Sequence, residues 1–183
     1  MAPTEDRAPE GLVLDAGADA RSRTFAVGSE EGEARWWFGS LATIRATREQ
    51  TRGHYTLVEV LNAEGEGPPH VHYREDEGFW ILEGELTFEV GEERIKAGPG
   101  SFVFGPKDVP HRYTVRSGSA RLLYILSPAG FEEFIYATSV PAEERALPPP
   151  PKGRPARLRW SSYEPPLATT RANCSSRARR SAR

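Results

Sequence analysis

Side chains that could bind a metal ion are concentrated in the stretch GPPHVHYREDEGFWILEGE, residues 67–85. The chain has four histidines, and two of them, His70 and His72, lie one residue apart in this stretch. In an extended segment both rings point to the same face, so each could offer one neutral nitrogen to a shared cation at about 2.0–2.2 Å. Because an H-x-H pair also occurs at packed or exposed positions, further ligands are needed to indicate a metal site.

Two further residues complete a candidate ligand set. Glu77 is in phase with the apolar residues of the strand that it opens, so its carboxylate can point inward with them. His111 lies far along the chain, directly before another predicted strand, and Pro106 and Pro110 restrict the backbone that leads to it. Burying three imidazoles and a carboxylate without a cation would be costly. The pattern therefore predicts that these two residues and the histidine pair bind one divalent ion.

The composition describes an acidic body with a basic end. A length of 183 residues suits one compact domain with a sizeable core. Residues 152–183 carry nine Lys or Arg and one acid, and subtraction from the totals of 24 basic and 26 acidic residues leaves 15 basic and 25 acidic in residues 1–151. A body of net charge −10 is thus followed by an end of +8. Few aromatic residues lie between these arginines, so they do not predict nucleic-acid binding.

The cytoplasm is the expected location of the protein. The single cysteine, Cys174, cannot form an intramolecular disulfide, which fits a reducing compartment. The first residues, MAPTEDRAPEGLVLDAG, are acidic where a secretion signal needs a basic region. No stretch reaches the roughly 20 apolar residues that a membrane-spanning helix requires. No membrane partner is expected.

Short runs rich in aromatic and β-branched residues recur from residue 36 onward, each bounded by Gly, Pro or charged residues. In ELTFEVGEE, residues 85–93, apolar and polar side chains alternate, which is the pattern of a half-buried strand. Roughly eight strands at this spacing indicate an antiparallel sandwich or barrel. The runs are Trp36–Ala46, Tyr55–Leu61, Phe79–Leu82, Leu86–Val90, Glu93–Ile95, Ser101–Phe104, Arg112–Val115 and Arg121–Leu126.

A short helix is predicted after the last strand. The segment SPAGFEEFIYAT offers Ser127 as the N-cap and Pro128 as the first helical residue. Four consecutive prolines at 148–151 then end regular structure. We therefore expect an N-terminal arm over residues 1–34, a β-barrel with its closing helix over 35–147, and a Pro-rich, then basic, disordered tail over 148–183.

The segment around the histidine pair resembles the first motif of the cupin family, G-x5-H-x-H-x3–4-E-x6-G. His70, His72 and Glu77 occupy its ligand positions, and Gly84 occupies its final glycine. The leading glycine is displaced from the position that the motif gives it. The resemblance implies an all-β cupin fold, a double-stranded β-helix or jelly-roll-like barrel, closed by a short helix.

The region before His111 resembles the second cupin motif, G-x5-P-x-G-x2-H-x3-N. Gly100, Pro106 and His111 match it, whereas Asp108 replaces its inner glycine and Val115 its asparagine. These departures concern the geometry of the turn and leave the ligand position intact. The two motifs together imply a His3Glu metal site.

Among cupins the layout most resembles small single-domain bacterial proteins grouped with quercetin 2,3-dioxygenases. The resemblance implies a metal-dependent dioxygenase that cleaves a flavonol or a related enolisable aromatic with dioxygen, with Glu77 as both ligand and general base. The ligands do not distinguish Ni, Fe, Mn, Co, Cu and Zn. Two alternatives stay open: a cupin isomerase, cyclase or decarboxylase, and a non-catalytic protein that binds a metal or small ligand.

Aromatic residues near the ligands are candidates to contact a planar substrate. Phe79 is in phase with Glu77, and Tyr113 with His111, so both could line the cavity. Phe102, Phe104 and Phe131 could lie at its mouth. Packing in the core is the alternative for each.

A homodimer is expected on two grounds. Small cupins leave open sheet edges, which favour pairing with another chain. The run Trp36–Trp37–Phe38 also offers more apolar surface than one face of a strand can bury.

Overall fold

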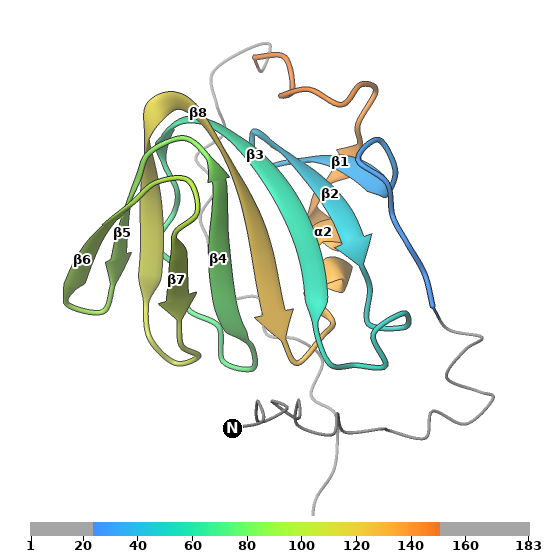
Figure 1. The fold of residues 1–183 in the computed structure, drawn as a ribbon, viewed down its shortest axis with the longest axis horizontal. Coiled ribbons are helices and arrows are strands. Elements are labelled where there is room, and N and C mark those ends of the chain that lie inside the picture. The colour runs from blue at the N-terminus through green and yellow to red at the C-terminus, as the bar shows by residue number, and fades with distance from the viewer. Residues whose placement is uncertain (1–23, 151–183) are drawn as a thin grey trace, which may run out of the picture. The chain divides into compact units, whose positions relative to one another are not determined.

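The computed structural model describes residues 24–150, which form an antiparallel β-sheet and a short helix (Figure 1). The strands are β1 (Glu33–Trp37), β2 (Ser40–Ala46), β3 (Thr56–Glu66), β4 (Asp76–Glu83), β5 (Leu86–Val90), β6 (Glu93–Ala97), β7 (Phe102–Gly105), β8 (His111–Ser127) and β9 (Val140–Pro141), and the helix is α2 (Phe131–Thr138). The predicted all-β class with one closing helix is confirmed. Most of the predicted arm, the basic tail and Cys174 lie outside the described residues.

The long strand β8 organises the sheet because it pairs with three other strands. Its first residues pair with β5, most of its length pairs with β3, and its last residues also pair with β4. Strand β4 pairs in turn with β7. Figure 1 shows β8 bending from the β5–β6 hairpin across to β3 and β4, so the sheet curls round an interior. The sequence predicted two strands within residues 112–126, but pairing with β3 keeps the chain extended between them.

The run Trp36–Ala46, expected as one strand, is a hairpin of β1 and β2. Its turn residues, Phe38 and Gly39, have φ angles of 50° and 85°. Two successive residues in this left-handed region are what a two-residue hairpin turn requires. Because the sequence has Phe-Gly where Asn-Gly is the usual signal, the turn was not predicted.

Apolar side chains fill the interior of the curled sheet. Leu86 and Phe88 alternate inward as predicted and are 2% and 1% exposed. The ring of Phe79 packs against those of Phe88 and Tyr124 at centroid distances of 5.1 and 5.3 Å. Each fully buried side chain of this size contributes about 1.5–3 kcal/mol relative to an exposed one, so this core holds the ligand-bearing strands in place.

The helix begins three residues later than predicted. Its N-cap is Gly130, not Ser127, and no side chain caps it. Instead the buried carboxylate of Glu132 accepts hydrogen bonds from the backbone N–H of Gly130 at 3.1 Å, the backbone N–H of Arg48 at 2.5 Å and the hydroxyl of Thr56. These bonds tie the start of α2 to the start of β3. Within residues 24–150, no helix is both long and apolar enough to cross a bilayer.

Candidate metal centre

The four predicted ligands come from three segments that the sheet brings together. Glu77 lies on β4, where it pairs with Gly105 of β7. His70 and His72 lie in the loop before β4, and His111 opens β8. His70 and His111 exchange both backbone hydrogen bonds, at 3.0 and 2.9 Å, in an isolated antiparallel bridge. This bridge anchors the loop that carries the H-x-H pair to the start of β8.

The three imidazoles converge on one carboxylate oxygen. Oε2 of Glu77 lies 3.1 Å from Nε2 of His72, 3.1 Å from Nε2 of His111 and 3.5 Å from Nε2 of His70. One candidate ligand atom from each residue lies within 4.8 Å of all the others. The predicted set is therefore assembled in space as well as in sequence.

The cluster is buried on one side and open on the other. The side chains of Glu77 and His111 are 2% and 1% exposed, whereas that of His70 is 29% exposed. The side chain of His70 is therefore the part of the cluster that solvent contacts most.

The far side of each ring determines which nitrogen is free to bind a metal. Nδ1 of His70 lies 3.1 Å from the carbonyl of Pro68, and Nδ1 of His111 lies 2.9 Å from that of Val109. Since a carbonyl only accepts, both Nδ1 atoms carry the proton and leave Nε2 with its lone pair toward the cluster. Such outer contacts orient metal-binding histidines.

His72 differs from the other two histidines because its Nδ1 faces a carboxylate. Oε2 of Glu75 lies 3.8 Å from this nitrogen, and Glu75 is itself largely buried. Arg74 lies 3.3 Å from the other oxygen of Glu75. The negative charge behind the ring favours a protonated Nδ1 here too.

Burial and hydrogen bonding shift the pKa of Glu77 in opposite directions. Burial would raise the pKa of this carboxyl group, but hydrogen bonds from the three histidines, which need a proton on Nε2 in the metal-free cluster, outweigh burial and hold the pKa well below its usual range. Burial would likewise lower the pKa of His70, but the hydrogen bond and the charge of Glu77 raise it overall. The cluster thus favours a negative carboxylate and positive charge beside it.

This arrangement fits a divalent cation. If Nδ1 carries the proton on each ring, the three Nε2 lone pairs and the carboxylate all point at the same small volume and repel one another. A shared ion would satisfy all four ligands at once, and three nitrogens with one oxygen suit transition metals from Mn to Zn. The residues therefore fit the metal that the motifs imply.

The departure from the second motif at Asp108 preserves the turn. Asp108 has a φ of 64°, in the left-handed region where the motif has glycine, and aspartate is one of the residues that tolerate it. Its backbone N–H donates to the carbonyl of His72 at 2.7 Å. The substituted turn therefore still connects the segment before His111 to the H-x-H loop.

Two glycines are required by close contacts, and Gly105, to which the sequence analysis did not assign a role, lies against the metal cluster. A Cβ at Gly105 would lie 3.2 Å from Nδ1 and Cε1 of His111, so only glycine leaves this ring its full space. Gly84, the last residue of the first motif, has a φ of 89°, and a Cβ there would lie 2.5 Å from the carbonyl of Ser119. The role of Gly105, which is to leave room for the ring of His111, becomes visible only when β7 pairs with β4 and brings Gly105 opposite Glu77.

Two of the predicted substrate residues, Phe131 and Phe79, lie beside rings of the cluster, and Tyr113 lies behind Phe79 at a ring distance of 6.0 Å. The ring of Phe131, half-buried at the start of α2, meets that of His72 edge-on at 5.2 Å. Phe79 lies 5.9 Å from His111 but is 1% exposed, so it forms a wall of the core. Tyr113 donates to Asn62 at 3.0 Å and hydrogen-bonds Tyr124, and burial raises the pKa of both phenols.

The structure does not bring Phe102 and Phe104 to the cluster. Both alternate on β7 with the buried Val103, and they are 52% and 51% exposed. Their neighbour is Trp80, whose ring lies 6.4 Å from that of Phe102. Glu77 and Trp80 point to opposite faces of β4, so the expectation that these phenylalanines stand at the mouth of the site is wrong.

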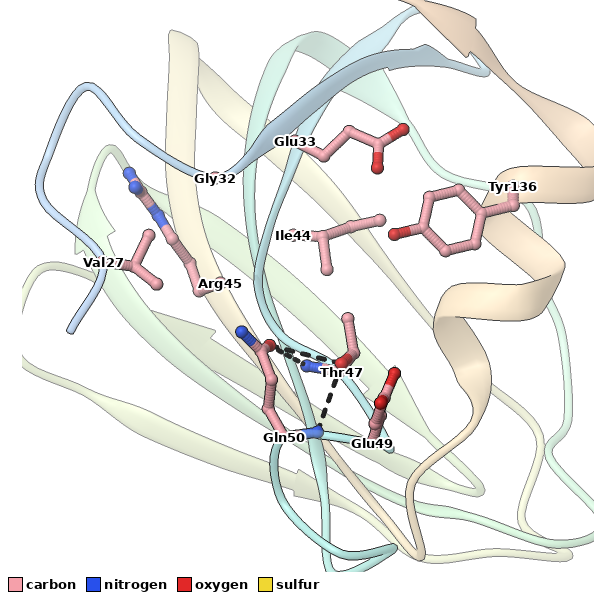
Figure 2. Close-up of a pocket in the computed structure, with 9 residues that line it drawn as sticks. All are labelled: Val27, Gly32, Glu33, Ile44, Arg45, Thr47, Glu49, Gln50 and Tyr136. Carbon is pink, nitrogen blue, oxygen red and sulfur yellow. Dashed lines mark hydrogen bonds between the residues drawn. The ribbon is translucent and has the colours of Figure 1, made fainter. Parts of the chain in front are cut away.

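A surface hollow of about 320 Å³ lies elsewhere, between the inner side of β1 and β2 and the helix (Figure 2). Figure 2 shows Tyr136 of α2 pointing toward Ile44, with Glu33 of β1 above both. Burial and the charge of Glu33 raise the pKa of Tyr136 to about 12. None of the predicted site residues lines this hollow, so it is not part of the metal cluster.

Comparison with known proteins agrees with the motifs. Residues 56–126 match the family model described as "Cupin domain". Quercetin 2,3-dioxygenase of Bacillus subtilis (strain 168) is 27% identical over 129 residues, which are 70% of this chain and 38% of that protein. The chain therefore spans well under half of that relative's length.

Solved structures share the fold at low sequence identity. KdgF from Halomonas sp. has a TM-score of 0.53 and 21% identity, over 60% of this chain and 97% of that one. An RmlC-like cupin from Shewanella frigidimarina has a TM-score of 0.52 and 21% identity, over 61% and 97%. Pac13, a nucleoside dehydratase from Streptomyces, has a TM-score of 0.50 and 20% identity, over 60% and 87%. The motifs, the domain match and the fold together show a cupin domain over residues 56–126, and the chain resembles the small cupins grouped with the quercetin 2,3-dioxygenases.

Proposed function

We propose that this protein is a metal-dependent dioxygenase that cleaves a flavonol or a related enolisable aromatic. The observation that carries the proposal is the convergence of three Nε2 atoms on one oxygen of Glu77, in a cluster open to solvent past His70. The likeness to the Bacillus enzyme supports the choice of substrate class. We propose His70, His72, Glu77 and His111 as the ligands of one divalent transition ion.

A bound divalent ion would supply Lewis-acid polarisation of a substrate oxygen. Glu77 would accept the proton of the substrate hydroxyl, since its lowered pKa keeps it unprotonated near neutral pH. The proton would move from the substrate oxygen to a carboxylate oxygen and leave an enolate that can react with dioxygen. The fixed ring orientations of His70 and His111 keep this carboxylate in place.

The surroundings of the cluster suit a planar apolar substrate. The edge of Phe131 beside His72 offers an aromatic surface, and Trp37 supports this ring at 5.9 Å. The buried wall made by Phe79 excludes water from the inner side. A substrate that enters past His70 would meet Glu77 before it met the core.

Oxygen consumption with quercetin under air, normalised to bound metal, tests the proposal. The His72→Ala variant should lose turnover, and His54→Ala, which changes the histidine outside the cluster, should keep it. Metal-loaded protein that consumes no oxygen with any flavonol would contradict the dioxygenase. If it instead converts a carbonyl substrate equally well without oxygen, the isomerase, cyclase or decarboxylase alternative holds.

A further inference from the structure

A chain of hydrogen-bonded polar side chains lies among the apolar residues of the interior. The hydroxyl of Tyr113 on β8 donates to Oδ1 of Asn62 on β3 at 3.0 Å. The hydroxyl of Ser40 on β2 donates to the same oxygen at 2.8 Å, and the hydroxyl of Tyr124 is bonded to that of Tyr113. We name these four residues the polar chain. Polar groups beside an apolar core are costly unless they are paired, and here they are paired mainly with one another.

Tyr113 brings one end of the polar chain close to the metal cluster. It follows His111 by two residues in β8, so both side chains point to the same face, and their Cα atoms are separated by roughly 7 Å along the strand. The ring of Phe79 lies 5.9 Å from that of His111 and 6.0 Å from that of Tyr113. Phe79 is therefore a shared neighbour of a candidate metal ligand and the polar chain.

Two aromatic rings connect the other end of the polar chain to the cluster. Ser40 is paired with Trp37 across the β1–β2 hairpin. The ring of Trp37 meets that of Phe131 edge-on at 5.9 Å, and Phe131 meets His72 at 5.2 Å. The neighbours thus form a continuous series that begins at His111, passes along the polar chain and the two rings, and returns to the cluster at His72.

Solvent contacts the rings of this series although they pack against the core. Trp37, Tyr113 and Phe131 are only partly buried, whereas Phe79 and Phe88, which Tyr113 also contacts, are both 1% exposed. The interior is therefore open at the end where the three partly buried rings lie. Apolar walls with a few placed polar groups are the usual composition of a small-molecule site.

The hydrogen bonds of the polar chain leave capacity for a further partner. Because Tyr113 gives its only proton to Asn62, the proton in the bond between the two phenols comes from Tyr124. The oxygens of Tyr113 and Ser40 can each accept one more bond from a ligand. Within residues 24–150, the amide nitrogen of Asn62 has one long contact, 3.5 Å to the carbonyl of Val60. A hydroxyl group, which both donates and accepts, matches this set.

We propose that the polar chain binds a second hydroxyl group of the substrate, remote from the hydroxyl that gives its proton to Glu77. The inference rests on the proposed dioxygenase and names its substrate more narrowly, as a flavonol with hydroxyls on more than one ring. A planar molecule of two or three rings is long enough to reach from the cluster to Tyr113, and the two aromatic rings offer it an apolar surface. The sequence analysis expected Tyr113 to line the site, and the polar chain adds Asn62 and Ser40 to substrate recognition.

Binding in the absence of oxygen tests the polar chain separately from turnover. Metal-loaded, full-length protein is titrated with quercetin, which has hydroxyls on both ring systems, and with 3-hydroxyflavone, which has the enol hydroxyl alone. Tryptophan fluorescence reports binding. Tyr113→Phe should weaken quercetin binding by about 2–10-fold, the usual effect of one hydrogen bond, and leave binding of 3-hydroxyflavone unchanged. Tyr136→Phe is the matched control, since this phenol lines the separate hollow of Figure 2, and it should change neither affinity.

A role of the polar chain in packing alone would change both affinities together. Metal content and circular dichroism are measured for each variant, and Ser40→Ala should show the same selective loss if Tyr113→Phe does not fold. Equal changes for the two flavones, or no change for either, would overturn the polar chain as a binding site and leave the dioxygenase intact. A metal-loaded wild type that binds neither flavone would contradict the flavonol substrate itself, and this inference with it.

Discussion

Nε2 of His111 lies 3.1 Å from Oε2 of Glu77, while Nδ1 on the far side of the same ring lies 2.9 Å from the carbonyl of Val109. The ring is thus held from behind by a group that can only accept a hydrogen bond, and in the neutral ring the lone pair of Nε2 faces a carboxylate. The same relationship recurs at His70. Two lone pairs at this distance repel unless a proton or a metal cation lies between them, so a bound metal would replace the protons that the rings share with Glu77, and its removal is expected to weaken the cluster.

Removal of the metal should destabilise the folded protein. A chelator leaves the Nε2 atoms and Glu77 facing one another, and ligand binding to the folded state stabilises it by about 2.7 kcal/mol at a hundredfold excess over Kd. We expect a lower melting temperature after chelation and recovery when a divalent ion is restored. The His72→Ala variant provides the control, because its melting temperature should not respond to chelator. A wild type that melts at the same temperature with and without chelator would show that the cluster is satisfied without an ion.

Glu75 should act as a positioning residue for His72. Glu75→Gln removes the charge behind Nδ1, and loss of such outer partners typically costs about 10–100-fold in metal affinity. Titration against a competing chelator measures this change. Glu92→Gln, an exposed acid in the turn between β5 and β6, should leave the affinity unchanged. Equal affinities for Glu75→Gln and wild type would mean that the 3.8 Å approach has no influence on the ligand.

Gly105→Ala should displace His111. The added methyl group would lie 3.2 Å from the ring, tighter than ordinary contact, so the ring must shift and metal affinity should fall. Gly118→Ala is the matched control, since a Cβ there meets nothing within 4 Å. Both variants should fold, and a chelator titration should separate them. Indistinguishable affinities would show that the ring tolerates the methyl group.

The Glu77→Gln variant distinguishes a role of Glu77 in proton transfer from a role in metal binding. The amide keeps an oxygen donor of similar size but cannot accept the substrate proton. Metal occupancy should fall moderately, and turnover per bound metal should fall by about 10²–10⁴-fold, the contribution of general-base catalysis. Glu77→Asp keeps the charge and should retain more activity than the glutamine variant. A wild-type rate per bound metal in Glu77→Gln would make this residue a ligand only.

The sequence predicted which four candidate ligands converge because two local rules carried the information. The parity of an extended strand aligned His70 with His72, and the motif spacing added Glu77 and His111. Phe102 and Phe104 share one face of β7, but the sequence alone does not say which face of that strand is inward. In the structure Val103 is buried and the two phenylalanines are exposed.

Contacts distant in sequence explain the other differences. Gly105 has a role only because His111 lies close to it. The helix is capped at Gly130, and not at the predicted Ser127, where the carboxylate of Glu132 connects the start of α2 to Arg48 and to Thr56 at the start of β3. No residue pattern near Gly105 or Gly130 in the sequence indicates either contact. The Phe38–Gly39 turn lacks the residues that usually announce a hairpin, so one predicted strand became two.

The central claim is that one divalent transition ion binds at His70, His72, Glu77 and His111. Elemental analysis of protein purified without chelators tests it most directly, with His72→Ala and His54→Ala measured in parallel. We expect close to one ion per chain in the wild type and in His54→Ala, and most of it lost in His72→Ala. Equal metal content in the wild type and His72→Ala would contradict the site.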